Sequence, residues 1–274
     1  MISILGCGWL GLPLAELLIS EGKIVKGSTH TLEKIIELEQ AGIKPFYIDL
    51  SPGLNENADL NFFDSEILII NIPPKRREDI VDYHKKQFES LISIIENSSI
   101  KKVLFISSTS VYPDVQRVVT EEDATNPDKE SGKALLEVEK MLMTNKNFRS
   151  TILRFSGLIG YDRHPGRFLA GKKELKNGNV PVNLIHRDDC IAIINEIINK
   201  QVWGEVFNGS ADRHPKRKEY YIHAAQMLGL QVPEFVNDST DSGYKIVSGE
   251  KLKARLNYVF KYPDPMNFIN EYHG

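Results

Sequence analysis

Residues 2–11 read Ile2-Ser3-Ile4-Leu5-Gly6-Cys7-Gly8-Trp9-Leu10-Gly11, a short hydrophobic run that leads directly into three spaced glycines. This is a G-x-G-x-x-G pattern between an expected strand at 2–5 and an expected helix at 12–20. In this pattern the first glycine permits a tight turn, the second lets the backbone approach a diphosphate, and the third lets the helix pack on the strand. The stretch predicts a dinucleotide site formed by Gly6, Gly8, Trp9, Leu10 and Gly11, and the alternative is a plain turn.

The sequence that follows repeats this alternation of strands and helices. Strands are expected at 24–26, 46–48, 67–70, 103–106 and 151–153, and helices at 32–40, 80–97 and 133–144. Such alternation indicates crossover connections and a parallel sheet, which binds ligands at the carboxyl ends of its strands. We therefore predict an α/β fold with a Rossmann-type doubly wound parallel sheet.

The pattern loosens after Gly157, where glycines and prolines mark loops before helices expected at 191–199 and 218–228 and a strand at 205–207. We expect residues 1–160 to form the dinucleotide-binding domain, to which 181–204 return. Residues 161–274 are expected to form a small substrate-binding lobe. No internal repeat or flexible linker separates the two parts.

Composition excludes several classes of protein. The chain has 274 residues, with 34 Lys and Arg against 37 Asp and Glu, and this balance does not favour nucleic-acid binding. No run approaches the ~18 apolar residues of a membrane helix. The two cysteines lie far apart and no Cys/His cluster is present, so we expect a reducing compartment and no metal site. The N-terminus lacks a basic start, so we expect no cleaved signal and a cytoplasmic location.

The end of the second expected strand bears on the choice of dinucleotide. Proteins that bind NAD place an Asp or Glu there to hold the ribose 2′-hydroxyl, whereas this chain has Gly27-Ser28-Thr29-His30-Thr31. The side chains of Ser28, Thr29 and His30 could donate hydrogen bonds to a 2′-phosphate. We therefore predict NADP as the preferred cofactor, with NAD as the alternative. These hydroxyls could instead cap a helix that opens at Leu32.

Two further strand ends are candidates for cofactor contacts. Asp49 and Leu50 follow the third strand, where a carboxylate could accept a hydrogen bond from an adenine amino group; Asp49 could instead form the turn before Ser51-Pro52. Ile72 and Pro73 follow the fourth strand, where a stiff backbone would pass the cofactor ribose.

The end of the fifth strand, Ser107-Ser108-Thr109-Ser110-Val111-Tyr112-Pro113, resembles the Ser-Ser-x-x-Val-Tyr-Gly stretch of extended short-chain dehydrogenases/reductases, the nucleotide-sugar epimerase and dehydratase group. Leu153-Arg154-Phe155 with Gly157 to Gly160, Asn183 to Asp189, and Gly204 to Asn208 are similar to later motifs of that family. Together the matches span residues 6 to 208.

The resemblance implies roles for individual residues. Ser108 matches the catalytic Ser/Thr, and Lys133 matches the lysine of Tyr-x-x-x-Lys, which is carried on a helix and holds the nicotinamide ribose. Lys129 stands in place of the tyrosine, and an exposed ammonium does not replace a phenol as proton donor. This departure points to the atypical branch of the family. Tyr112 and Thr109 are the nearest hydroxyl candidates for the proton donor, and the alternative for each is a packing or turn residue. The resemblance implies substrate recognition at Arg163, Arg167 and Phe168, and the alternative there is an ordinary surface loop.

Two functions follow as hypotheses. The first is an NAD(P)-dependent oxidoreductase or epimerase/dehydratase-like enzyme that acts on a small polar substrate, such as a nucleotide sugar. The second is an NAD(P)-binding sensor or regulatory protein that has lost catalysis, which Lys129 favours. By analogy with the family, a homodimer would form through the helices at 80–97 and 133–144. His186 and Asp189 are interpreted as a capping arrangement, and Arg154 either faces the pocket or forms a buried ion pair.

Overall fold

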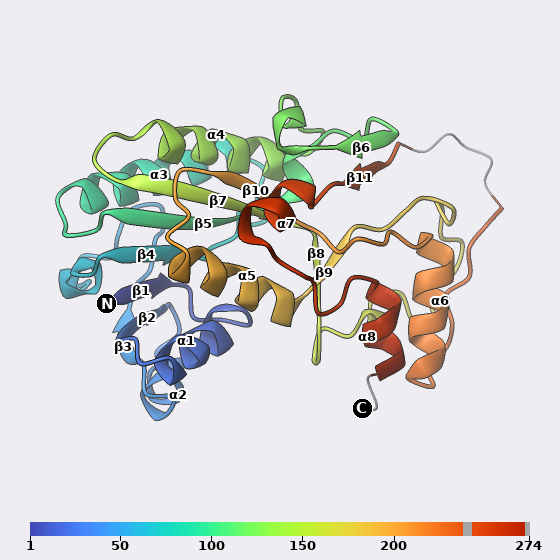
Figure 1. Ribbon diagram of the computed structural model, residues 1–274, viewed down its shortest axis with the longest axis horizontal. Coiled ribbons are helices and arrows are strands. Elements are labelled where there is room, and N and C mark those ends of the chain that lie inside the picture. The colour runs from blue at the N-terminus through green and yellow to red at the C-terminus, as the bar shows by residue number, and fades with distance from the viewer. Residues whose placement is uncertain (238–242, 272–274) are drawn as a thin grey trace. The chain divides into compact units, whose positions relative to one another are not determined.

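The computed structural model describes residues 1–237 and 243–271 (Figure 1). Its strands are β1 (Ile2–Leu5), β2 (Val25–Thr29), β3 (Lys44–Tyr47), β4 (Ile67–Ile70), β5 (Lys102–Ser108), β6 (Arg117–Val119), β7 (Arg149–Phe155), β8 (Gly157–Ile159), β9 (Leu184–His186), β10 (Val206–Gly209) and β11 (Lys245–Val247). Its α-helices are α1 (Gly11–Ser20), α2 (Lys34–Gln40), α3 (Ile80–Glu96), α4 (Glu130–Thr144), α5 (Arg187–Asn199), α6 (Arg217–Met227), α7 (Glu250–Leu256) and α8 (Pro265–Glu271). Short 3-10 helices lie at Leu60–Phe63, Thr109–Val111, Glu121–Asp123 and Pro165–Arg167.

Seven strands form one sheet in the order β10-β7-β5-β4-β1-β2-β3. β1 pairs in parallel with β2 and β4, β2 pairs in parallel with β3, and β4 with β5. The chain thus builds outward from β1 to β3 and then crosses back to start β4 on the other side of β1. This is the strand order of a doubly wound sheet, so the predicted fold class is confirmed.

The strand order places the switch point of the sheet between β1 and β4, which are both buried along their whole length. The residues that follow these strands, Gly6 and Asn71, therefore lie at the edge where doubly wound sheets bind ligands. Figure 1 shows α3 and α4 on the face of the sheet opposite to α1 and α2. Both faces are covered by helices, which is why a central strand such as β4 is a continuous hydrophobic run.

Two compact units make up the chain. The first comprises residues 1–111, 126–154 and 194–207, and the second comprises 112–125, 155–193 and the described residues from 208 onward. The units therefore alternate along the chain, whereas the sequence suggested a single change near residue 160 with a return at 181–204. The assignment of one part to the cofactor and the other to the substrate stays a prediction.

The second unit contains two small parallel strand pairs, β8 with β9 and β6 with β11. A buried cluster joins β8 and β9 to α6 and α8, with members Ile159, Val182, Leu184, Tyr220, Ala224, Phe268 and Ile269. In the described parts of the chain, none of the helices combines the length and the apolar character needed to cross a membrane.

Candidate functional site

Glycine is required at two positions of the turn between β1 and α1. Gly6 has φ +101°, and a Cβ there would lie 2.6 Å from the carbonyl oxygen of Asn71. A Cβ on Gly11 would lie 2.3 Å from the carbonyl oxygen of Gly6. Side chains do not tolerate such approaches to backbone atoms, so this turn closes only with glycine at both positions.

Gly8, by contrast, faces open space. Across residues 1–237 and 243–271, a Cβ on Gly8 would meet no heavy atom within 4 Å apart from its chain neighbours. No described side chain caps the N-terminus of α1, and its first turn carries no acidic residue. Trp9 is half-buried and Leu10 is buried. The turn thus presents accessible backbone at the positive end of a helix, an arrangement that suits an anionic diphosphate.

Asn71 and Ser28 hold the turn from two neighbouring strands. The Asn71 side-chain amide donates to the Gly6 carbonyl oxygen at 3.1 Å, and the Gly6 N–H donates to Ser28 Oγ at 3.0 Å. The Cys7 N–H donates to the Ser28 carbonyl oxygen at 2.8 Å. The sequence assigned Ser28 to a phosphate contact, but Ser28 is 1% exposed and its hydroxyl oxygen supports the turn.

The other two residues predicted to contact a 2′-phosphate differ in exposure. Thr29 is 7% exposed, and its hydroxyl oxygen accepts the Thr31 N–H at 3.1 Å. His30 is exposed. Of Ser28, Thr29 and His30, the histidine is therefore the one whose side chain reaches solvent.

Cys7, Ile72 and Pro73 complete the surroundings of the turn. Ile72 is half-buried, with Cγ2 3.4 Å from the position of a Cβ on Gly6, and Pro73 is exposed. Cys7 is buried without a disulfide, and burial raises the pKa of its thiol to about 12. Cys7 is therefore a neutral packing residue, with its sulfur against Gly27.

Asp49 lies two residues beyond β3 and takes part in a turn. Its Oδ1 accepts the Ser51 hydroxyl at 3.0 Å, and its backbone N–H donates to Asn55 Oδ1 at 2.9 Å. The carbonyl oxygen of Leu50 accepts a hydrogen bond from Gln87 Nε2 at 2.6 Å. These contacts match the turn-forming role that the sequence left open for Asp49, while an adenine contact stays a prediction.

The carboxyl end of β5 lies against the start of α4. Ser108 is half-buried, and its Oγ accepts the Ser110 N–H at 3.1 Å; Thr109 is 8% exposed. A Cβ on Gly132 would lie 2.2 Å from the Ser110 carbonyl oxygen. The structure thus brings the Ser108 turn next to the first turn of α4, which carries Lys133.

Lys129 and Lys133 lie in different backbone environments. Lys133 is in α4, and its exposed ammonium forms an ion pair with Glu130 at 2.6 Å. Lys129 precedes the helix in an extended conformation with φ −109° and ψ 141°, and it is also exposed. The sequence predicted a helix from Lys133 onward, and the observed helix begins three residues earlier, at Glu130, so that Lys129 lies outside it. The family's tyrosine position is occupied here by an ammonium outside the helix.

A buried ion pair lies beneath the end of β5. Arg154 Nη2 and Glu139 Oε2 are 2.6 Å apart, with side chains 6% and 4% exposed, and the Ser107 hydroxyl donates to Glu139 Oε1 at 2.5 Å. The ion pair that the sequence left open for Arg154 is confirmed. It joins α4 to β5 and β7, the elements that carry Lys133 and Ser108.

Tyr112, Arg163, Arg167 and Phe168 belong to the second unit. Tyr112 is 1% exposed, and its hydroxyl donates to Asn208 Oδ1 at 2.6 Å, so it has the packing role of a buried tyrosine. Arg163, Arg167 and Phe168 are exposed around the 3-10 helix Pro165–Arg167. Their contact with a substrate stays a prediction.

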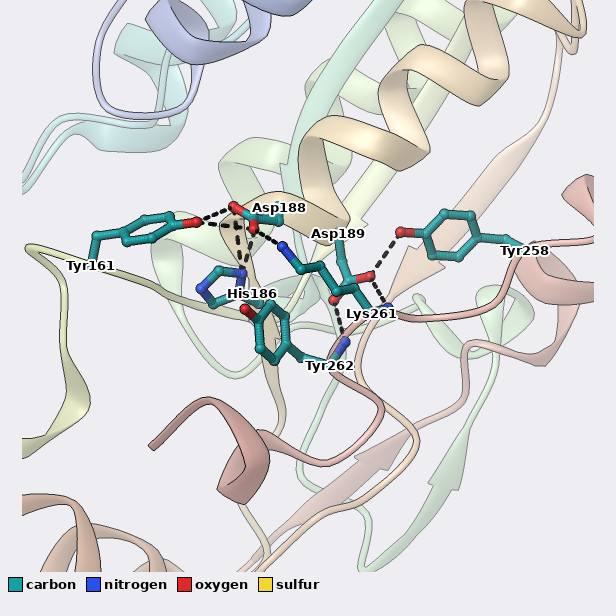
Figure 2. A network of polar contacts seen from close by, with 7 residues as sticks. All are labelled: Tyr161, His186, Asp188, Asp189, Tyr258, Lys261 and Tyr262. Atoms are coloured by element: carbon teal, nitrogen blue, oxygen red, sulfur yellow. Dashed lines mark hydrogen bonds and ion pairs between the residues drawn. The ribbon is translucent and has the colours of Figure 1, made fainter. Parts of the chain in front are cut away.

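Asp189 fastens a C-terminal segment of the second unit (Figure 2). Asp189 is buried, and its carboxylate accepts the Tyr258 hydroxyl at 2.7 Å and the backbone N–H groups of Lys261 and Tyr262 at 2.7 and 3.1 Å. The sequence expected Asp189 to cap a helix, but it binds residues about seventy positions away in the chain. Asp189 is therefore a structural residue that holds a distant segment of the chain and not a helix cap.

His186 has the local role that the sequence expected. Its Nδ1 accepts the Asp188 N–H at 3.2 Å at the start of α5, and burial lowers its pKa to about 4. Asp188 also accepts the Tyr161 hydroxyl at 3.0 Å and the Lys261 ammonium at 2.7 Å (Figure 2). In residues 1–237 and 243–271, no three His, Cys, Asp or Glu side chains are placed to hold a metal ion.

Sequence reasoning missed four polar residues that the structure places in or under the site. Asn71 could have been found, because it is a polar residue directly after a buried strand at the switch point. The other three are His84 and Gln87, which interrupt the apolar face of α3, and Glu139, which interrupts that of α4. That interruption is a signal in the sequence, but it does not identify the partner.

The comparisons with known proteins agree with this geometry. No family model matches the sequence. The chain is 36% identical over 268 residues to protein YeeZ of Escherichia coli, covering 97% of each chain. It is similar to a candidate NAD-dependent epimerase/dehydratase from Methylobacillus flagellatus, with 26% identity, a TM-score of 0.72, and 98% and 96% of the two chains covered. UDP-glucuronic acid 4-epimerase from Bacillus cereus, solved in complex with NAD, has a similar fold at 18% identity, with a TM-score of 0.78 and 98% of both chains covered. The chain is therefore a relative of YeeZ, and it belongs to the extended short-chain dehydrogenase/reductase family of its solved neighbours.

Proposed function

We propose that the protein binds a nicotinamide dinucleotide at the turn between β1 and α1. The observation that carries this proposal is the difference among the three glycines. Gly6 and Gly11 close the turn against backbone, while a Cβ on Gly8 would enter open space at the N-terminus of α1, with no cap from any described side chain. Such a turn fits a diphosphate, and the Bacillus cereus epimerase of similar fold was solved with NAD.

We propose NADP as the preferred dinucleotide and NAD as the second choice. The end of β2 and the loop after it, residues 27–31, contain no carboxylate that would repel a 2′-phosphate, and the exposed His30 can donate to one. At the other positions, the proposal assigns Asp49 and Leu50 to the adenine and Lys133 to the nicotinamide ribose. Lys133 would exchange its exposed partner Glu130 for the ribose, at little cost because the pair is solvated.

The proposed activity is that of an oxidoreductase or epimerase/dehydratase-like enzyme acting on a small polar substrate of the nucleotide-sugar class. A bound nicotinamide supplies hydride acceptance and return. Ser108 would orient a substrate oxygen through its hydroxyl. That hydroxyl accepts the Ser110 N–H, and the Ser110 carbonyl lies against Gly132 in the first turn of α4. Thr109, Arg163, Arg167 and Phe168 are the residues proposed for substrate recognition.

A second candidate function is a cofactor-binding sensor or regulatory protein. Lys129 favours it, because the position of the family's proton-donating tyrosine holds an exposed ammonium outside α4. The retained Ser108 and Lys133 favour the enzyme.

Turnover measurements on Lys129→Tyr separate the two functions. Nucleotide sugars are incubated with oxidised and reduced NADP or NAD, and the absorbance of the reduced nicotinamide and the sugar products are followed. If the protein is an enzyme, the parent protein should show turnover. The sensor predicts turnover in Lys129→Tyr alone, with none in the parent or in the control Lys140→Tyr, which changes another exposed lysine. Turnover by the parent would contradict the sensor, and absence of turnover in all three proteins across the substrate panel would contradict both predictions.

A further inference from the structure

The buried face of α3 carries two polar side chains among apolar ones. Its buried residues are Ile80, His84, Gln87, Phe88, Leu91 and Ile95. His84 has no exposed surface and Gln87 is 4% exposed. Burial of an amide or an imidazole costs free energy unless its polar atoms find partners, so this pair needs a reason to be in the core.

The partner of Gln87 is the backbone beyond β3. Its Nε2 donates to the Leu50 carbonyl oxygen at 2.6 Å, across 37 positions of the chain. His84 Nδ1 lies 3.0 Å from Gln87 Oε1. An amide oxygen can only accept, so His84 Nδ1 carries the proton and donates. His84 thereby fixes the orientation of the Gln87 amide, leaving its NH2 group to Leu50.

The loop around Leu50 closes on itself through other backbone groups. The Leu50 carbonyl oxygen is therefore left to accept a hydrogen bond from α3. The Ser51 N–H donates to the Gly53 carbonyl oxygen, and the Asn55 N–H donates to the Asp49 carbonyl oxygen, both at 2.9 Å. These bonds shape the loop but do not attach it to the helix layer. The bond from Gln87 supplies that attachment at the residue next to Asp49.

We propose that Gln87, oriented by His84, is a positioning residue that holds the Asp49–Leu50 segment in place to receive the adenine of the cofactor. This inference rests on the proposed dinucleotide site and extends it to the helix beneath. Asp49 would contact the adenine directly, whereas Gln87 acts through the Leu50 backbone. A merely structural role for Gln87 would affect all ligands alike, while a positioning role affects the adenine half alone.

The test compares two halves of the cofactor as calorimetric probes, ADP and reduced nicotinamide mononucleotide. Gln87→Met keeps the side-chain length and removes the donor. We expect it to weaken ADP binding about tenfold, the scale of one lost hydrogen bond, and to leave the mononucleotide unchanged. Amide hydrogen exchange should become faster in residues 50–55. Ser3→Ala is the matched control, since Ser3 is a buried donor to the Phe62 carbonyl oxygen elsewhere in the same unit.

A second variant keeps the test informative if Gln87→Met does not fold. His84→Phe retains a ring beside Phe88 and leaves the Gln87 amide without its orienting donor, so we expect a smaller loss of ADP affinity of about threefold. Equal weakening of both probes, or ADP affinity within twofold of the parent for the folded variants, would overturn the positioning role while the dinucleotide site stands. Failure of the parent protein to bind any nicotinamide dinucleotide would overturn the proposed function itself.

Discussion

His186 is a titratable side chain held without exposed surface among aromatic rings. Its ring centroid lies 4.1 Å from that of Tyr262 and 4.5 Å from that of Phe268. Its Nδ1 accepts the Asp188 N–H, so protonation at this atom would set two donors against each other. Burial lowers the pKa to about 4, against the attraction of Asp188 and with added repulsion from Lys261 and Arg187.

This burial predicts that acid weakens the fold over a defined range. A histidine in the unfolded chain has a pKa near 6.5. Between about pH 6.5 and about pH 4, the unfolded state therefore binds a proton at this residue and the folded state does not. The contribution of His186 to the free energy of unfolding is present above about pH 6.5 and decreases as the pH approaches 4, by up to about 3 kcal/mol.

Urea unfolding of the parent and of His186→Asn at several pH values between about 7 and about 4 measures this contribution. The Asn side-chain oxygen can still accept the Asp188 N–H, and the other buried histidines remain in both proteins. We expect the variant to lose less stability on acidification than the parent. Parallel pH profiles for the two proteins would refute the assignment of the effect to His186.

Individual residues differ in how far the sequence reveals them. The conformation of Gly6 and the close packing of Gly11 follow from the glycine spacing, since each is a local requirement of a turn between strand and helix. The bond between the Gly6 N–H and Ser28 does not, because it depends on the register of β1 and β2, in which Ile4 lies opposite Gly27. Register is a property of paired strands, and no single segment encodes it.

At the scale of elements, α4 is joined to the sheet through charge as well as apolar contact. The Glu139 carboxylate is 4% exposed and is shared by Arg154 and Ser107. A buried ion pair contributes little net stability compared with apolar residues of similar size, but removing one partner leaves an uncompensated charge. The pair therefore fixes how α4 lies on β5 and β7 more than it strengthens the fold.

We expect Arg154→Met to lower the free energy of unfolding by about 3 to 5 kcal/mol, since it strands the Glu139 carboxylate in the core. The double variant Glu139→Met with Arg154→Met should recover most of this loss, because neither charge is then buried. Urea denaturation of the three proteins gives the comparison. A double variant as unstable as the single one would show that packing of the arginine, and not its charge, stabilises this region.

The elements of the central sheet could be predicted because each carries its own hydrophobic pattern. The expected strand at 67–70 and helix at 80–97 match β4 and α3 within one residue. The short strands β6, β8 and β11 were not predicted. Each has three residues, too few to show alternation, and Lys245 in β11 pairs with Arg117 in β6 across more than a hundred residues. Their existence depends on tertiary pairing.

At the scale of the whole molecule, the sequence predicted the alternation of strands and helices that builds the sheet. It did not predict that residues 112–125 belong to the second unit. Residues 112–125 belong to the second unit although they lie between β5 and α4, because β6 pairs with β11. Nothing local in that segment signals a partner so late in the chain. The expected homodimer through the helices at 80–97 and 133–144 stays a prediction.

The central claim is that the turn between β1 and α1 receives the diphosphate of a nicotinamide dinucleotide. Calorimetric titration of the parent protein, Gly8→Asp and Gly22→Asp with NADP and NAD tests it directly. Both glycines have open space at the Cβ position in the described structure, so both variants should fold; Gly22 has φ +80°, which Asp tolerates better than most residues. In Gly8→Asp, the new carboxylate would occupy the space proposed for the diphosphate and would repel its negative charge.

We predict that the parent binds both nucleotides, NADP more tightly, that Gly8→Asp loses at least about a hundredfold in affinity, and that Gly22→Asp binds as the parent does. No heat of binding with either nucleotide in the folded parent, or unchanged affinity in Gly8→Asp, would contradict the account.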